Sequence, residues 1–75
     1  MNLEWDPQPP NEWHLCNGLT LVGWIDYSKF RPEGYQYIAW LSVPNDRVNM
    51  GFFGSLSEAK RALRAYAARA VQHGG

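Results

Sequence analysis

Alternating apolar and polar positions between residues 12 and 26 predict two β-strands joined by a tight turn. The Asn17-Gly18 pair separates the two apolar runs. Such a pair is typical of a type I′ hairpin turn, because both central residues of that turn need a positive φ. We therefore expect strands at about residues 12–16 and 19–26.

A second hairpin is predicted after the polar loop of residues 26–34. Residues 35–43 are rich in aromatic and β-branched side chains, which favour a strand. The turn residues Pro44-Asn45-Asp46 follow, and residues 47–53 complete the hairpin with a last strand.

The end of the chain has the pattern of an amphipathic helix. Ser55 and Glu58 fit a capping box, in which each side chain accepts a hydrogen bond from the other residue's backbone N–H. Good helix formers continue from there to about residue 72. We expect one face of this helix to pack on the sheet, with two large anchors, Leu63 and Tyr66, among small residues. The predicted face comprises Ala59, Ala62, Leu63, Tyr66, Ala67 and Ala70.

These elements predict an α+β fold in which an antiparallel sheet of three or four strands packs one face on a C-terminal helix (βββα or ββββα). A length of 75 residues, with 45% hydrophobic and 19% charged side chains, fits one small globular domain. We assign that domain to residues 12–75. Residues 1–11 hold three of the five prolines and are expected to form an extended arm, on which Trp5 docks against the domain.

The predicted sheet has two apolar faces, although one helix can cover only one of them. Alternation places Val22 and Trp24 on the second face of one strand, and Ile38 and Trp40 on the second face of another. Three coverings are open: the arm together with Trp13, a second copy of the chain, or a partner that binds the exposed face.

Charge is balanced overall but unevenly distributed along the chain. The formal net charge is zero, yet residues 1–27 carry four acidic side chains and no Lys or Arg, whereas residues 47–75 are basic. A basic segment is typical of a nucleic-acid-binding face. Alternatively, the cations complement the helix dipole, and the acidic half attracts the basic half within the fold.

Few residues suggest catalytic chemistry. His14 and Cys16 lie two residues apart on a predicted strand and share a face, as a thiolate–imidazole pair or the start of a metal site would require. The sequence has no second Cys, and the other His is His73, so three or four metal ligands are not available. We expect no enzyme activity, no cofactor and no metal site.

Residues 37–70 resemble a known pattern. Gly51-Phe52-Phe53 is followed by Ser55 or Ser57 and then by Glu58-Ala59. This order resembles the last hairpin and helix of the Apetala-type plant DNA-binding domain, and it is similar to the arm-site-binding domain of phage integrases. The end of the double-stranded RNA-binding domain is more weakly similar. The resemblance implies a three-stranded antiparallel sheet on one helix. In those families the outer sheet face carries Arg, Lys and Trp, whereas here that face keeps Trp40 and has no basic residue in the strands at 19–26 and 35–43.

We therefore expect a small non-enzymatic module that binds a protein partner through Val22, Trp24, Ile38 and Trp40. The chain resembles the small inhibitor proteins of phages, anti-CRISPR proteins among them, which implies a phage-encoded inhibitor of a host protein that acts in the host cytoplasm. A homodimer through the same face is a second arrangement. No apolar run approaches the length of a membrane span, so no membrane is expected. The alternative function is nucleic-acid binding of the integrase-arm or Apetala type, with phosphate contacts from Arg47, Arg61 and Arg64.

Overall fold

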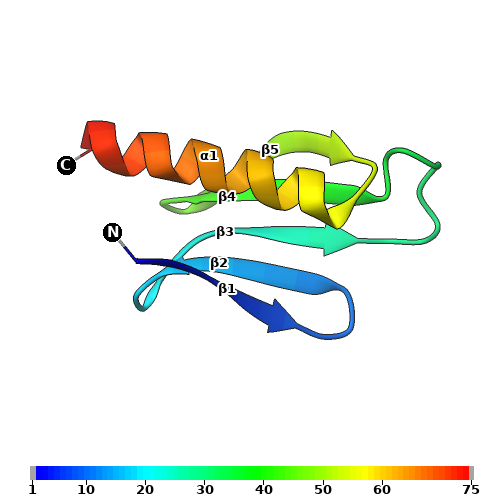
Figure 1. Cartoon of the computed structure of the whole chain (residues 1–75), viewed down its shortest axis with the longest axis horizontal. Coiled ribbons are helices and arrows are strands. Elements are labelled where there is room, and N and C mark those ends of the chain that lie inside the picture. Colours follow the sequence, from blue (N-terminus) through cyan, green and yellow to red (C-terminus); the bar gives the residue numbers. More distant parts are fainter. Residues whose placement is uncertain (1, 75) are drawn as a thin grey trace.

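Five strands form one antiparallel sheet, and a single helix packs against it (Figure 1). The structure, a computed structural model, describes residues 2–74 and the side chains of residues 2–69. Each strand pairs with its neighbours in the chain, so the sheet order is the chain order. The α+β class with one antiparallel sheet and one C-terminal helix is confirmed. The elements are β1 (Leu3–Gln8), β2 (Glu12–Asn17), β3 (Thr20–Tyr27), β4 (Tyr37–Val43), β5 (Asp46–Phe53) and α1 (Leu56–Gly74).

The predicted number of strands is corrected from three or four to five, because the segment expected to be an arm is β1. It pairs with β2 along its whole length, from Leu3 opposite Asn17 to Gln8 opposite Glu12. Pro7 is compatible with this strand because β1 lies at the edge of the sheet, where a missing N–H need not break a ladder.

The first predicted hairpin forms, but its turn lies one residue later than expected. Asn17 pairs with Thr20, so the central residues of the turn are Gly18 and Leu19. Gly18 has a φ of 62°, and Asn17 does not have a positive φ. Glycine at the first central position is typical of a type II′ turn, not of the type I′ turn expected from Asn17-Gly18.

The second hairpin and the helix start agree with the sequence. Pro44 and Asn45 are the central residues between β4 and β5, and the φ of 63° at Asn45 matches the second central position of a type II turn. At the helix start, the backbone N–H of Glu58 donates a hydrogen bond to Ser55 Oγ at 3.2 Å. Ser55 is therefore the N-cap, as predicted.

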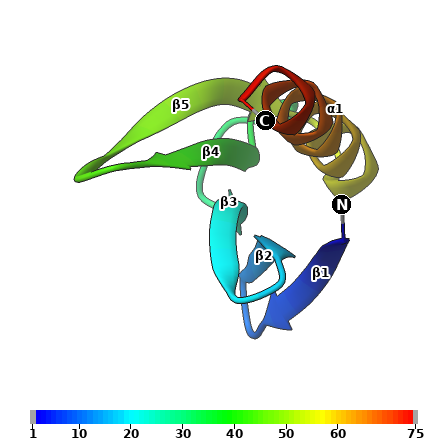
Figure 2. The ribbon, with the colours of Figure 1, turned by 90° about the vertical axis from the view of Figure 1, so that its left-hand side faces the viewer.

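The sheet curls strongly, and α1 lies on its concave side (Figure 2). The helix covers β3, β4 and β5, and the curl brings β1 back toward it. Leu15, Ile25 and Leu63 are the largest fully buried side chains of the core between these layers. Buried alanines, Ala39 from β4 and Ala59 and Ala67 from α1, keep the helix close to the sheet.

One predicted helix anchor is wrong. The buried row of the helix is Ala59, Leu63 and Ala67, whereas Tyr66 is 45% exposed. Tyr66 lies about 100° around the helix axis from Ala67, so it flanks the buried row instead of facing the sheet. Ala62 is half-buried, and the side chain of Ala70 lies outside the described residues.

Two β-bulges interrupt the ladders and contribute to the curl. Leu15 pairs with Gly23 but Cys16 pairs with Leu21, which leaves Val22 as an extra residue in β3. In the same way, Met50 is an extra residue in β5. An extra residue bends its strand and increases the local twist.

Candidate functional site

The convex face of the sheet, opposite α1, carries the candidate site. Strand pairing orders its side chains into rows that run across all five strands. The middle row is Asp6, His14, Trp24, Trp40 and Asn49. A second row is Gln8, Glu12, Asp26, Ile38 and Phe52. On this face, most of the carboxylates therefore lie on β1 and β2, and the large apolar side chains lie on β3, β4 and β5.

We call Trp24, Ile38, Trp40 and Phe52 the aromatic strip. The rings of Trp24 and Trp40 stack with their centroids 6.2 Å apart and their planes at 21°. The guanidinium carbon of Arg47 lies 4.3 Å from the Trp40 centroid, in a cation–π contact. Both tryptophans are half-buried, and Phe52 is 47% exposed. The strip therefore presents aromatic surface in the middle of an otherwise polar face.

Three of the four residues predicted for the outer sheet face lie on it, and Val22 does not. Val22 packs against the core on the helix side. The bulge explains this correction: an extra residue reverses the alternation of the strand, so Leu21, opposite Cys16, takes the convex position. Leu21 is 36% exposed and borders the aromatic strip.

One end of the aromatic strip is closed by the loop between β3 and β4. The Arg31 guanidinium donates hydrogen bonds to the backbone oxygens of Asp26, at 3.2 Å, and Gln36, at 3.0 Å. It also forms an ion pair with the Asp26 carboxylate at 3.2 Å. Ile38, next to Asp26 in its row, is only 7% exposed. The accessible part of the strip is therefore centred on the two tryptophans.

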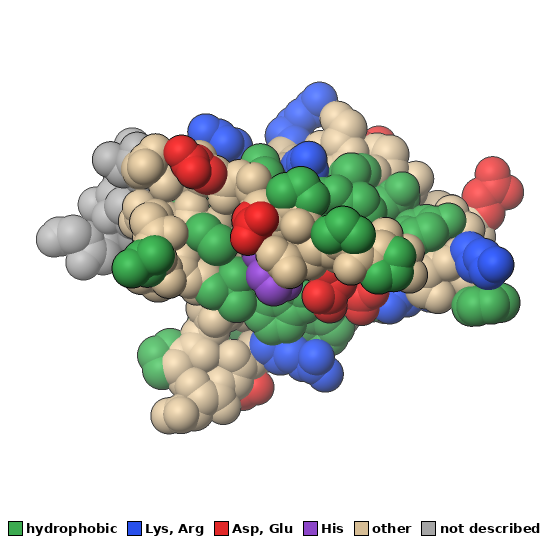
Figure 3. Space-filling view, turned by 90° about the horizontal axis from the view of Figure 1, so that it is seen from below, with side chains coloured by type: hydrophobic (Ala, Val, Ile, Leu, Met, Phe, Trp, Pro, Cys, Tyr) green, Lys and Arg blue, Asp and Glu red, His purple; other side chains and the backbone are tan. Residues whose placement is uncertain are grey.

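We call Glu4, Asp6 and Glu12 the acidic strip. They occupy the convex face of the two strands next to the aromatic strip, and all three are exposed. On the face shown in Figure 3, acidic side chains (red) lie next to a His side chain (purple). Glu12 is 3.5 Å from His14 Nε2, and among residues 2–69 neither Glu4 nor Asp6 forms a salt bridge. Two of the three carboxylates, those of Glu4 and Asp6, therefore have no cationic partner among the described side chains.

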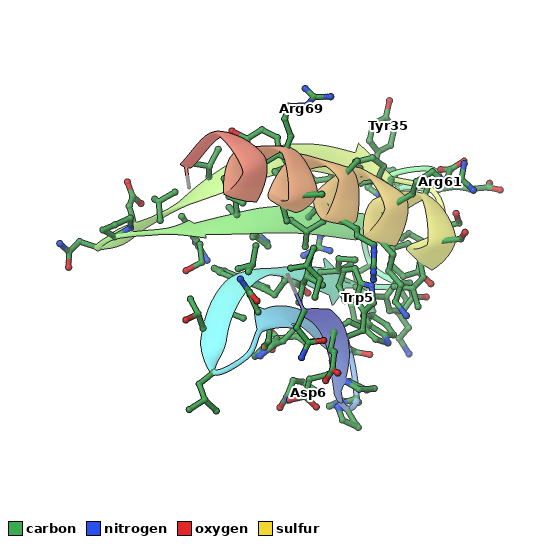
Figure 4. The ribbon with its side chains drawn as sticks, turned by 60° about the vertical axis from the view of Figure 1, so that its left-hand side comes forward. Trp5, Asp6, Tyr35, Arg61 and Arg69 are labelled. Carbon is green, nitrogen blue, oxygen red and sulfur yellow. The ribbon has the colours of Figure 1, made fainter. Side chains whose placement is uncertain are left out.

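The N-terminal segment does not cover the convex face. Trp5 docks, as predicted, but on the helix side, where Lys60 Nζ lies 5.3 Å from its ring centroid. In Figure 4, Trp5 points toward the helix and its neighbour Asp6 points away from it. Trp13 also packs on the helix side, against Tyr37. The covering of the second face by the arm and Trp13 is therefore wrong, because alternation along β1 and β2 turns both tryptophans inward.

The three arginines predicted to contact nucleic acid do not share a surface. Arg47 lies on the convex face beside Trp40, whereas Arg61 and Arg64 are exposed on α1, which packs on the concave side. Among the described residues, Asp26 forms an ion pair with Arg31 and Glu12 lies 3.5 Å from His14 Nε2, and neither contact involves the helix. The described residues therefore form no direct ion pair between the acidic residues 1–27 and the basic residues 47–69.

The structure places His14 and Cys16 on the same face of β2, as predicted, in the acidic part of the convex surface. Cys16 is a free, half-buried thiol. Among the described side chains, no group of three or more His, Cys, Asp or Glu residues is placed to hold a metal ion. The side chain of His73 lies outside the described residues.

In the part of the chain that the structure describes, no helix combines the length and the apolar character needed to cross a membrane.

Sequence reasoning missed Leu21 and Phe52, and it did not place the carboxylates of the acidic strip beside the tryptophans. The alternation of side chains in residues 47–53 could have predicted that Phe52 lies on the other face of the sheet from Phe53. The acidic strip depends on β1 being a strand, and three prolines in the first eleven residues obscured that signal.

Comparison with known proteins finds no matching family model, curated protein or solved structure.

Proposed function

We propose that this protein is a non-enzymatic binding module whose convex sheet face docks a protein partner. The observation that carries the proposal is the stacked Trp24–Trp40 pair, half-buried and uncovered by any described element at the centre of that face. Tryptophan, tyrosine and arginine are the side chains that most often carry binding energy in protein interfaces. Here Arg47 and the two tryptophans form one contiguous cluster.

The arrangement of the face supports a specific interface. An aromatic centre bordered by charged residues is the usual composition of a protein-binding patch, in which the centre loses water and the rim stays hydrated. Arg31 ties the loop onto the sheet, so one end of the face is preorganised. Preorganisation lowers the entropy cost of binding.

The same face is poorly suited to nucleic acid. Glu4, Asp6 and Glu12 lie beside the tryptophans on which bases would stack, and they would repel the phosphate backbone. The basic residues of α1 are on the other side of the molecule. Nucleic-acid binding stays the alternative prediction. In that case the basic residues of α1 would contact the phosphates, and the aromatic strip would take no part.

Capture from a host lysate on immobilised full-length protein tests the proposal. We expect proteins retained by the wild type to be lost with Trp24→Ala and with Trp40→Ala, because each change removes a large part of the aromatic centre. The matched control is Tyr66→Ala, which removes an exposed aromatic ring from the helix. Circular dichroism of each variant verifies that the fold persists.

Two outcomes contradict the proposal. One is a retained set that is unchanged by both tryptophan substitutions, and the other is an equal loss with Tyr66→Ala. That the partner is a host protein inhibited by a phage-encoded chain stays a prediction from the sequence.

A further inference from the structure

We infer that the segment docked on the convex face is cationic and bears arginine. It would lie across the acidic strip, with a guanidinium in contact with the Trp24 ring. This inference rests on the proposed function, and it adds the chemistry of the partner.

Charge complementarity is the first argument. Glu4, Asp6 and Glu12 present carboxylates from two adjacent strands, and the one basic side chain among them in the rows is His14. Neither Glu4 nor Asp6 forms a salt bridge within residues 2–69. A partner that brought neutral or acidic groups to this surface would leave these charges unpaired, whereas a cationic segment would pair them.

The chain's own Arg47 provides the second argument. Its guanidinium already occupies the Trp40 side of the tryptophan pair, 4.3 Å from the ring centroid. Trp24, the other member, lies on the acidic side, next to His14 and then Asp6 in the same row. A guanidinium entering there can stack on the indole ring and direct its remaining donors toward the acidic side of the row, because it is planar and carries five donors. Lysine, with a single point charge, satisfies both contacts less well.

Shape favours a flexible segment over a second copy of the chain. Of the exposed arginines of this protein, Arg47 already contacts its own Trp40, and the others lie on α1. Both the helix and the outer sheet surface are convex (Figure 2). Two convex surfaces meet over a small area, and stable specific interfaces bury on the order of 1,200–2,000 Å². An extended segment can follow the curvature of the sheet and contact both strips.

Titration calorimetry with synthetic peptides tests the inference on the full chain. The probes are a short peptide of Arg-Leu-Gly repeats and matched Lys-Leu-Gly and Glu-Leu-Gly peptides. We expect the arginine peptide to bind at least about tenfold more tightly than the glutamate peptide, and more tightly than the lysine peptide.

A pair of charge-reversal variants locates the binding. Asp6→Lys should weaken binding of the arginine peptide about tenfold, whereas Glu33→Lys, the same charge change on the exposed loop between β3 and β4, should weaken it less than about twofold. Equal effects of the two variants, or equal binding of the arginine and glutamate peptides, would overturn the inference. Self-association of the wild type that Asp6→Lys abolishes would also overturn it, since a second copy would then occupy the face.

This test separates the inference from the proposed function. If capture from lysate depends on the tryptophans but the peptides show no charge preference, docking stands and the cationic segment is wrong. If capture does not depend on the tryptophans, the docking function itself fails.

Discussion

Gly23 is a point of close packing, where β3 lies against the backbone of β4 and the side chain of Leu63 on α1. A Cβ atom at this position would lie 2.4 Å from the Trp40 carbonyl oxygen and 2.9 Å from Leu63 Cδ1. The first of these is a backbone atom of the neighbouring strand, which cannot move without disturbing the ladder. Glycine is therefore needed here so that Leu63 can pack directly on the sheet. The Trp24–Trp40 pair lies next to this position, on the other face of the sheet.

We expect Gly23→Ala to lower the free energy of unfolding by about 1–3 kcal/mol, because the added methyl group overpacks the contact between α1 and the sheet. Urea denaturation monitored by circular dichroism measures the change. Gly54→Ala is the control, since a Cβ there would make ordinary contact at 3.5 Å or more. A Gly23→Ala variant as stable as the control would contradict this account of the contact.

Arg31 acts on the face by fixing the adjoining loop. Replacement by lysine keeps the charge but cannot reproduce the contacts to Asp26 and Gln36, because one ammonium group cannot span three acceptors. We expect Arg31→Lys to destabilise the protein by about 1–2 kcal/mol. It should also speed amide exchange at Ile38. Lys29→Ala, which removes an exposed cation from the same loop, should change neither measurement, and an equal effect of the two variants would argue against the role of Arg31.

At the scale of elements, the sequence predicted an element correctly where a single local pattern was sufficient to define it. Apolar alternation, the Pro44-Asn45 turn and the Ser55 cap located the hairpins and the helix correctly. The extra residue in β3 could not be predicted from the sequence. Displacing the first turn by one residue moves each cross-strand partner by two and leaves the faces unchanged, whereas the extra residue brings Ile25 opposite Trp13, on the core side. Val22 was misplaced for this reason.

The sequence also did not predict β1 as a strand. Prolines are unfavourable in internal strands, and only the pairing with β2 shows that this segment lies at the sheet edge, where a proline is tolerated. The candidate site was therefore predicted in its aromatic half and missed in its acidic half. Trp24, Ile38 and Trp40 lie on central strands with regular pairing, whereas Glu4 and Asp6 depend on β1.

Strand β1 completes the core as well as carrying two residues of the acidic strip. Leu3 is buried against the helix-side core, and Trp5 packs beside it. We expect Leu3→Ala to lower the free energy of unfolding by about 2–3 kcal/mol, because it leaves a cavity where the curled sheet approaches α1. Leu19→Ala, the same change at a fully exposed turn residue, should cost less than about 0.5 kcal/mol.

Deleting residues 1–11 extends this test to the whole strand. The truncated chain should melt at a lower temperature and elute earlier by self-association, because β2 becomes an unpaired edge. A melting midpoint and an elution volume both equal to those of the full chain would show that β1 contributes nothing to the fold.

For the whole molecule, the zero net charge conceals a separation of charge between two opposite sides. The acidic strip lies on the convex sheet face, and Arg61, Arg64 and Arg69 are exposed on α1. In Figure 4, Arg61 and Arg69 point away from the sheet and Asp6 points in the opposite direction. A charged partner or surface therefore meets mainly carboxylates at the acidic strip and mainly cations on the helix, and it is attracted over about the Debye length, ~10 Å at 0.1 M salt.

Ion-exchange chromatography at neutral pH and low salt should reveal this separation. We expect the wild type to be retained on a cation exchanger through the helix and on an anion exchanger through the acidic strip, although its net charge is zero. Arg64→Gln should shorten retention on the cation exchanger more than Lys29→Gln does, because both remove one positive charge but only Arg64 belongs to the helix cluster. Asp6→Asn should shorten retention on the anion exchanger more than Glu33→Gln does, for the same reason. If the members of each pair behave alike, retention follows net charge alone, and the two faces do not act as separate electrostatic surfaces.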